Sequence, residues 1–115
     1  GPTTVVWSTS TDWSTKLYDA GSQRMLKKIT KYNHWLRSMT FVTSTGIVWN
    51  SSTDKSISFW KTNGEQHQVP HLHKGRLQLY SVVHCMEHDP EHDLVWTADE
   101  HHLRIYNAQT YEHLH

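Results

Sequence analysis

Cysteine, net charge and long apolar runs are scarce or missing in this sequence of 115 residues. Cys85 is the single cysteine, so no disulfide can form within the chain, and we expect a reducing, cytoplasmic compartment. Eleven Lys and Arg balance eleven Asp and Glu, which argues against general nucleic-acid binding. No apolar stretch approaches the roughly twenty residues of a membrane span, and no charged-then-apolar leader opens the chain. We therefore expect a soluble protein with no membrane span.

Sequence motifs of catalysis are also missing. The chain has no Gly-x-Ser-x-Gly elbow, no phosphate-cradling Gly-rich loop and no His-Glu-x-x-His segment. Neighbouring acids such as Glu91 and Asp93 fall in expected turns, where a paired general acid and base is rarely found. We expect that the protein is not an enzyme and uses no cofactor.

Glycine and proline are few, with five and three residues, whereas Trp, Tyr, Ser and Thr are abundant. This composition favours pleated, half-buried strands over helices or disorder, so we expect an all-β fold. The length fits a single domain, which we place at residues 3–115. Gly1 and Pro2 resemble the pair that protease removal of a purification tag leaves behind, and they are set aside.

One pattern, an apolar residue followed by Val and Trp, recurs three times. The three copies end at Trp7, Trp49 and Trp96, so they are spaced by 42 and 47 residues. Such a period fits propeller blades or helix pairs, and the alternation of apolar and polar residues favours strands. After each copy comes a polar turn and a second strand that ends in an aromatic residue, at residues 16–18, 57–60 and 103–106. Further strands are expected at residues 24–29, 36–42 and 79–86, the last as an inner strand buried on both faces.

The aromatic residue of each second strand has an acid six positions before it. The pairs are Asp12 with Tyr18, Asp54 with Trp60, and Glu100 with Tyr106. With the repeat, these residues make the sequence resemble the WD-repeat family of β-propellers, whose blades are four-stranded antiparallel sheets with an aromatic-acid pair closing the third strand. The corresponding pairs here are Tyr18-Asp19, Trp60-Lys61 and Tyr106-Asn107. The resemblance implies a propeller with degenerate repeats.

The resemblance also implies a hydrogen-bond network in each blade, in which a His donates to the turn acid and meets a strand hydroxyl. His34 is the candidate partner of Asp54, because a neutral imidazole can bridge a carboxylate and a hydroxyl. The strand position holds Ser8 and Asn50 in the first two repeats and Trp96 in the third. We therefore expect His34 and Asp54 to be coupled.

When strands are assigned in the family's order, the chain begins in the second strand of one blade, completes a second blade and ends early in the last strand of a third. The chain is thus expected to form two and a half to three four-stranded antiparallel blades, with blade parts at residues 3–32, 33–72 and 73–115. Closed propellers hold about four to eight blades. We expect either that further blades of the native chain complete the ring or that copies associate as a homo-oligomer.

Eleven histidines are many for this length, and some of them cluster. His84, His88 and His92 have a spacing that would align three imidazoles for zinc on a helix. Pro90 argues against that helix, so we expect residues 87–93 to form an acidic hairpin loop in which His88 and His92 are solvated. The sequence therefore predicts no metal site, and these three histidines are the candidates for adventitious binding.

By resemblance, degenerate WD propellers occur in large intracellular regulators such as exchange factors for small GTPases and multidomain kinases, where they dock protein partners. We expect a non-catalytic, cytoplasmic protein-interaction module that serves as a scaffold and reads its partners with loops. The candidate binding residues are Trp13, Trp35, Arg37, Lys74 and Arg76. Carbohydrate binding by stacking on Trp13 and Trp35 is the alternative, and metal binding through the His clusters is the third hypothesis.

Overall fold

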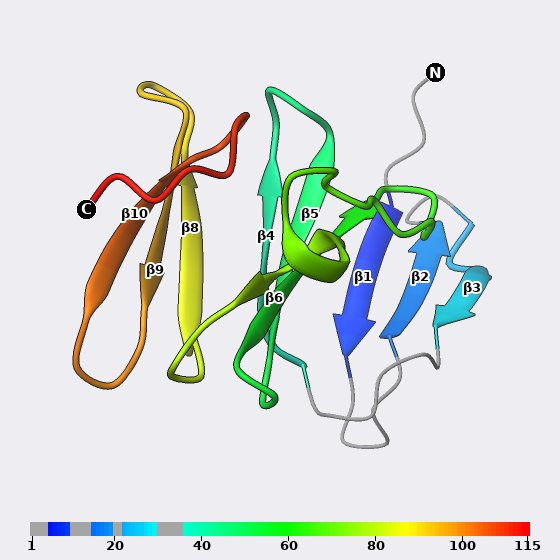
Figure 1. The fold of residues 1–115 in the computed structure, drawn as a ribbon. Coiled ribbons are helices and arrows are strands. Elements are labelled where there is room, and N and C mark those ends of the chain that lie inside the picture. The colour runs from blue at the N-terminus through cyan, green and yellow to red at the C-terminus, as the bar shows by residue number, and fades with distance from the viewer. Residues whose placement is uncertain (1–4, 10–14, 20–21, 30–35) are drawn as a thin grey trace.

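The computed structural model of the protein describes residues 5–9, 15–19, 22–29 and 36–115. Ten strands in these residues form three antiparallel sheets that stand side by side (Figure 1). The described residues also contain a short 3-10 turn at His73–Gly75. The all-β class expected from the composition is confirmed.

Each sheet contains strands that are close together in the sequence. The first sheet has the order β1 (Val5–Thr9), β2 (Thr15–Asp19), β3 (Met25–Ile29). The second has the order β4 (Leu36–Val42), β5 (Ile47–Ser52), β6 (Ser56–Lys61), β7 (Leu77–Gln78). The third contains β8 (Cys85–Asp89), β9 (Leu94–Ala98) and β10 (Leu103–Asn107), with β9 in the middle.

The C-terminal segment after β10 begins a fourth strand in the third sheet. The Ile105 N–H donates to the His115 carbonyl over 2.8 Å, and the Leu114 N–H donates to the Ile105 carbonyl over 2.7 Å. Tyr106 and His113 form an isolated antiparallel bridge. These hydrogen bonds agree with the expectation that the last residues begin the last strand of a third sheet.

The pairing register repeats from sheet to sheet. Val6 pairs with Tyr18, Val48 with Trp60, and Val95 with Tyr106. The next residue along is Trp in all three sheets: Trp7 pairs with Leu17, Trp49 with Phe59, and Trp96 with Ile105. Because side chains alternate along a strand, the second and third sheets each have one face that carries the Val-aromatic pair and an opposite face that carries the Trp.

The two interfaces between sheets bury the same kinds of face. Between the first and second sheets, Leu17, Val48 and Trp60 are buried, with Trp7 packed against them. Between the second and third sheets, a larger cluster is buried, which includes Trp49, Ile57, Phe59, Val95, Tyr106 and Tyr111. In both places the Trp face of one sheet packs on the Val-aromatic face of the next, so the repeat in the sequence encodes a repeated interface.

The strand expected at residues 79–86 is wrong. β8 begins only at Cys85, and the segment before it crosses from β7, at the edge of the second sheet, to the third sheet. Tyr80 on this crossover is 94% exposed, whereas Val83 is buried in the core and anchors the segment. Its apolar residues therefore serve the crossover between sheets and do not form an inner strand.

Two smaller differences concern boundaries. The strand expected at residues 24–29 begins at Met25, whereas that at 36–42 has the expected bounds. The blade boundary at residue 72 falls inside the second sheet, because β7 pairs with β6 through Ile57 and Leu77. The long β6–β7 loop, which has no aromatic repeat signal, concealed this last strand.

Candidate functional site

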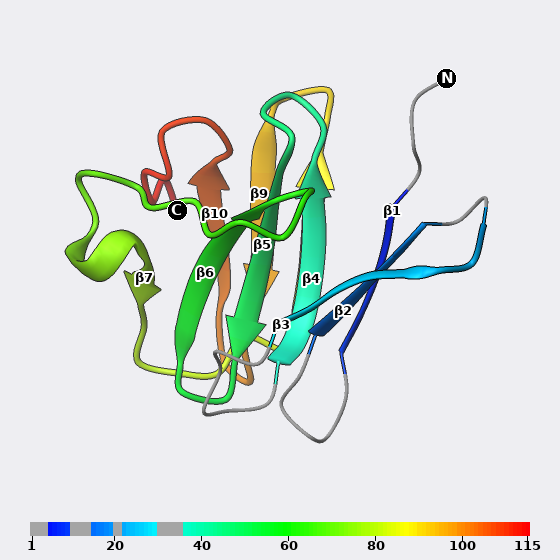
Figure 2. The same cartoon turned by 90° about the vertical axis from the view of Figure 1, so that its right-hand side faces the viewer.

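A groove lies between the second and third sheets. The β6–β7 loop lies beside the C-terminal segment there (Figure 2). Its volume is about 530 Å³. The loop and β7 supply one wall, and the end of β10 with the residues after it supplies the other. The lining residues are His71, Leu72, Leu77, Tyr106, Thr110, Tyr111, Glu112 and His113.

Tyr111 lines the groove, and its backbone has an uncommon conformation. Its φ of 65° lies in the left-handed region, which is unfavourable for a bulky residue. The preceding turn enforces it, because the Asn107 side chain accepts hydrogen bonds from the N–H groups of Gln109 and Thr110. The Tyr111 N–H then donates to the Asn107 carbonyl over 2.9 Å.

Aromatic packing holds the Tyr111 ring in this position. The ring is stacked on Trp49 with centroids 5.3 Å apart and meets Phe59 edge-on at 4.6 Å. Burial raises the pKa of Tyr111. The pKa of Tyr106 is raised as well, and burial is the largest cause of that shift. Tyr111 therefore lines the groove and also belongs to an aromatic cluster that joins the second sheet to the third.

One hydrogen bond crosses the groove. His71 Nε2 lies 3.0 Å from the Thr110 carbonyl oxygen, and because a carbonyl can only accept, Nε2 carries the proton. Gly75 shapes the same loop, since a Cβ there would lie 2.7 Å from the Gln68 Oε1 and its φ is 71°. The His71–Thr110 bond thus links the loop to the segment after β10, and Gly75 lets the loop backbone pass close to Gln68.

The groove combines apolar walls with a few polar groups at its rim. The His113 ring lies beside Tyr106 with centroids 5.1 Å apart, and the Glu112 side chain is exposed. Such a surface can accept an apolar or aromatic side chain and orient it with one carboxylate and two imidazoles. The groove could not be predicted from the sequence, because its residues come from segments about forty positions apart that have no shared motif.

The outer face of the third sheet carries apolar residues that no other described element covers. Trp96 and Ile105 are half-buried, and Leu103 is 60% exposed. In the second sheet the residues in the same register, Trp49, Phe59 and Ile57, are fully buried by the third sheet. We call Trp96, Leu103 and Ile105 the C-terminal face.

The first sheet has a corresponding outer face at the opposite end of the structure. Leu17 points to the second sheet and is buried, so its neighbours Lys16 and Tyr18 point away from it. Both are half-buried, and Met25, which pairs with Tyr18, is 54% exposed. We call Lys16, Tyr18 and Met25 the N-terminal face.

Asp93 connects three segments at the β8–β9 turn. Its carboxylate accepts hydrogen bonds from His88 Nε2 at 2.8 Å, from the Ser44 hydroxyl at 2.7 Å and from the Gln109 amide at 2.7 Å. These bonds, that from His88 first, lower the pKa of Asp93. The His88 side chain is only 5% exposed, so the expectation that it is solvated is wrong. The left-handed φ of 53° at Asp93 turns the chain back and brings the carboxylate to His88.

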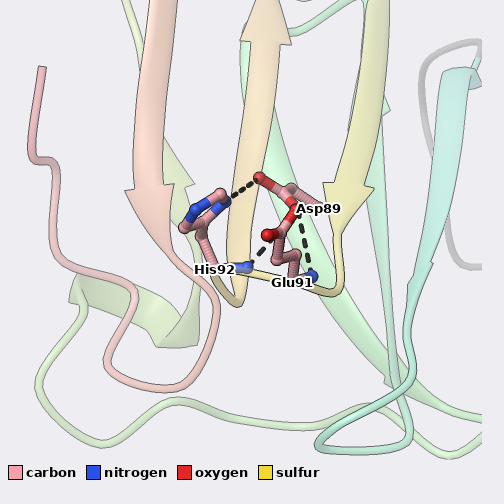
Figure 3. A group of neighbouring side chains, drawn as sticks. All are labelled: Asp89, Glu91 and His92. Atoms are coloured by element: carbon pink, nitrogen blue, oxygen red, sulfur yellow. Dashed lines mark hydrogen bonds and ion pairs between the residues drawn. The ribbon is translucent and has the colours of Figure 1, made fainter.

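Asp89, Glu91 and His92 gather at the tip of the same hairpin (Figure 3). One ligand atom from each lies within 4.8 Å of the others. The Asp89 carboxylate accepts hydrogen bonds from the N–H groups of Glu91 and His92 and from His92 Nδ1 at 2.9 Å. The His92 ring bond is the main cause of the lowered pKa of Asp89. These bonds are those of a tight turn, which accounts for the arrangement without an ion.

The three candidate histidines are not gathered at one point, because each contacts a different partner. His84 Nδ1 lies 3.0 Å from an Arg37 nitrogen, His88 bonds to Asp93, and His92 bonds to Asp89. Strand pairing causes the separation: β8 runs through residues 85–89 as a strand, so the helical spacing has no structural meaning. Residues 87–93 are therefore partly strand, and not the loop that the sequence suggested.

The hydrogen-bonded acid of the β9–β10 turn is Asp99, and Glu100 is exposed. The Asp99 side chain is fully buried and accepts from the N–H groups of His101 and His102 and from Arg104. Burial opposes its ionisation, but the hydrogen bonds from His101, Arg104 and His102 outweigh this effect and lower the pKa of Asp99 to about 2. The six-residue spacing pointed to the wrong member of the Asp99-Glu100 pair.

The other candidate residues are scattered or lie outside the described residues. Asp12, Trp13, His34 and Trp35 lie outside them. Asp54 accepts from the Ser56 N–H and hydroxyl. Trp60 and Tyr106 are each 2% exposed. On the surface, Arg37 and Lys74 are exposed, and Arg76 is half-buried.

No protein-family description matches the chain, and no curated protein is similar to it in sequence. Its structure is similar to the crystal structure of the Myceliophteria thermophila Cps50 (Swd1) β-propeller domain, with a TM-score of 0.70 and 12% sequence identity. The chain adopts a β-propeller fold. The similarity covers 96% of this chain and 34% of the Cps50 chain, so the present chain spans about a third of that protein's length. The three sheets are therefore propeller blades, and the groove lies between the second and third blades.

The propeller shown here is a partial one. Its blades are three-, four- and three-stranded in the described residues, which confirms the fold class expected from the repeat. No helix in the described residues is long and apolar enough to cross a membrane.

Proposed function

We propose that this β-propeller segment is a non-catalytic protein-interaction module of the WD type that serves as a scaffold in a larger intracellular regulator. Exchange factors for small GTPases and multidomain kinases are regulators of the kind in which such propellers occur. The exposed free thiol of Cys85 suits a reducing, cytoplasmic compartment. Rigid blades with variable loops favour recognition over catalysis.

The groove between the second and third blades is the observation that carries this proposal. Tyr111, Leu72 and Leu77 supply apolar side chains to its lining. The aromatic cluster holds Tyr111, and the His71–Thr110 hydrogen bond links the two sides of the groove. A groove whose two sides are already bonded to each other needs less ordering on binding, which favours a peptide segment of a protein partner. The exposed Glu112 carboxylate at the rim favours a peptide with a basic residue beside its apolar anchor.

Selection from a displayed library of random peptides tests the proposal. We expect the selected peptides to share an apolar-basic motif and to bind with micromolar affinity. Reversal of the rim charge in Glu112→Lys should weaken binding about tenfold, which corresponds to about 1.4 kcal/mol. Glu100→Lys, an equally exposed acid on another turn, is the matched control and should bind as the wild type does.

Two outcomes would contradict the proposal. Selection that yields no common motif, or peptides that bind Glu112→Lys and the wild type equally, would remove the groove as a recognition site. The carbohydrate alternative rests on Trp13 and Trp35, and binding on a glycan array that is lost in Trp13→Ala or Trp35→Ala would favour it instead.

A further inference from the structure

We infer that Arg37 binds a carboxylate of an acidic segment in a protein partner, at the end of the second and third blades where β4 and β8 begin (Figure 1). Arg37 lies on β4, and its guanidinium is hydrogen-bonded to His84, on the crossover that leads into β8. The site shares no residue with the groove and takes an acidic ligand, whereas a basic ligand is proposed for the groove. Failure of one proposal would therefore leave the other standing.

A β-bulge presents Arg37 to solvent. Leu36 pairs with Ser52 on β5, and the next paired residue of β4 is Ser38. Arg37 between them is an extra residue that has no pairing partner on β5. A bulge bends its strand locally and redirects side chains, and bulges are frequent next to functional sites. Arg37 is exposed, and its guanidinium reaches the crossover of the next blade.

Hydroxyl groups connect this bulge to the crossover. The Ser51 hydroxyl donates to the Val83 carbonyl over 2.8 Å. It accepts from the Ser38 N–H at 3.1 Å and, because its own proton is given to Val83, also from the Ser38 hydroxyl at 2.7 Å. Ser51 and Val83 are both buried, and Val83 directly precedes His84. The backbone on the two sides of the Arg37–His84 contact is therefore tied together.

His84 orients the Arg37 guanidinium without neutralising its charge. Arg37 Nη2 lies 3.0 Å from His84 Nδ1, and because a guanidinium can only donate, Nδ1 is the acceptor and carries no proton. The other N–H groups of the guanidinium remain available. No carboxylate among the described residues forms an ion pair with Arg37. Arg37 is thus an oriented cation without a counter-charge in the described part of the chain.

The β5–β6 and β9–β10 turns lie at the same end of the blades and offer little competition for Arg37. Two of their acids, Asp54 and Asp99, are already hydrogen-bonded within the chain. Glu100 is the one exposed acid of these two turns, and Lys55 is exposed as well. The exposed charge there, Arg37 and Lys55 against Glu100, is positive, which favours an acidic partner.

A single guanidinium fits a carboxylate better than a phosphate. The planar fork of an arginine makes parallel N–H···O bonds to both oxygens of a carboxylate, and the two opposite charges balance. A phosphorylated side chain carries a charge of about −1.5 to −2 and binds opposite clusters of arginines. Arg104, the arginine of β10, is engaged by the buried Asp99. The described residues therefore supply one arginine to the site, which matches a carboxylate.

Tyr80 offers a second contact on the same crossover. Its side chain is 94% exposed, although large aromatic side chains are usually covered in a folded protein. The Leu79 N–H donates to the Lys55 carbonyl over 2.8 Å, so the backbone next to Tyr80 is held against the β5–β6 turn. Exposed Tyr and Arg are the residue types that contribute most to binding in protein interfaces. The ligand is therefore a segment with an acidic residue next to an aromatic or apolar one.

Nuclear magnetic resonance titration of the whole 115-residue chain with synthetic peptides tests the inference. The probe is a short, end-capped peptide with one Glu between Phe residues, and the control peptide has Gln in place of Glu. We expect the Glu peptide to bind and to shift the Nε–H resonance of Arg37. The Gln peptide should bind at least about tenfold more weakly, because it cannot form the charge-assisted pair.

Variants of the site locate the contact. Arg37→Ala should raise the dissociation constant of the Glu peptide at least about tenfold, and Arg37→Lys, which keeps the charge and loses the fork, should also weaken binding. His84→Asp places a carboxylate beside Arg37, which should compete with the peptide and block binding. Arg24→Ala removes an exposed arginine of the first blade and is the matched control that should bind as the wild type does. Far-UV circular dichroism checks folding, and if Arg37→Ala is unfolded, Arg37→Lys and His84→Asp replace it.

Four results would overturn the inference. A Glu peptide that does not bind, or that binds no better than the Gln peptide, would show that no carboxylate is recognised. Equal affinities of the wild type and Arg37→Ala would place the contact elsewhere. An equal loss in Arg24→Ala would indicate a general effect of charge. Displacement of the Glu peptide by inorganic phosphate at a lower concentration than by acetate would indicate a phosphate site instead.

Discussion

Replacement of Trp60 by alanine gives a direct test of the packing between blades. Its side chain is 2% exposed and lies with Leu17 and Val48 between the first and second blades. A buried aromatic side chain removes about 150–250 Å² from water. At about 25 cal/mol per Å² this is about 4–6 kcal/mol, which is an upper bound because the unfolded chain already buries part of this surface.

We therefore expect Trp60→Ala to lower the free energy of unfolding by about 3–5 kcal/mol, the usual cost of deleting a core aromatic residue. That loss is a large fraction of the about 5–15 kcal/mol that stabilises a typical domain. Trp60→Phe should cost less, because an aromatic ring stays in the core. Its remaining cost includes the loss of the 3.1 Å hydrogen bond from Trp60 Nε1 to the Ser58 hydroxyl.

Urea unfolding at one fixed protein concentration, followed by far-UV circular dichroism, measures the effect, since association would otherwise change the apparent stability. Tyr80→Ala is the control, because Tyr80 is 94% exposed and its loss should change the free energy by less than about 0.5 kcal/mol. An unchanged midpoint for Trp60→Ala would refute the interface between the first two blades and the repeat alignment on which it rests.

Two further predictions concern buried polar groups. The lowered pKa of Asp99, about 2 against an ordinary 3.8, means that its ionised form adds stability above pH 3.8 and that this stability is lost as pH falls towards about 2. The urea midpoint should therefore fall less over this range in Asp99→Asn than in the wild type, and equal pH profiles would show that the carboxylate is not coupled to folding. The Asn50 side chain is fully buried, and its amide has no hydrogen-bond partner among the described residues. Asn50→Leu should stabilise the chain by about 1–3 kcal/mol, and a lower melting temperature would indicate that the amide is bonded.

Sequence periodicity was sufficient for the all-β fold and for the register of the blades. The Val-Trp repeat and the aromatic residue of the next strand recur because every blade must bury one face on its neighbour. Such a constraint acts on local residues with a period of two, so it is visible in a linear sequence. The same logic predicts that Trp60 and Tyr106 lie in strands, and the structure confirms it.

Sequence spacing failed where the chain leaves regular strands. The histidines at positions 84, 88 and 92 suggested a shared site, but strand geometry sends each to a different partner. Glu100 has the spacing of a turn acid, yet the neighbouring Asp99 is the residue that Arg104 reaches. A shift of one residue decides which carboxylate is buried, and such a shift depends on the turn conformation, which spacing alone does not specify.

The sequence by itself determined the composition of each face, since alternation along the strands sets which side chains share a surface. Tertiary structure alone decided which faces are covered. Trp49 and Trp96 occupy the same position in their repeats, yet Trp49 is fully buried against the third blade and Trp96 is half-buried. The groove depends even more on tertiary structure, because His71 and Thr110 meet across thirty-nine positions of sequence through a loop and a left-handed turn at Tyr111. Local patterns encode what a strand presents, whereas contacts between distant segments exist only after the blades have packed.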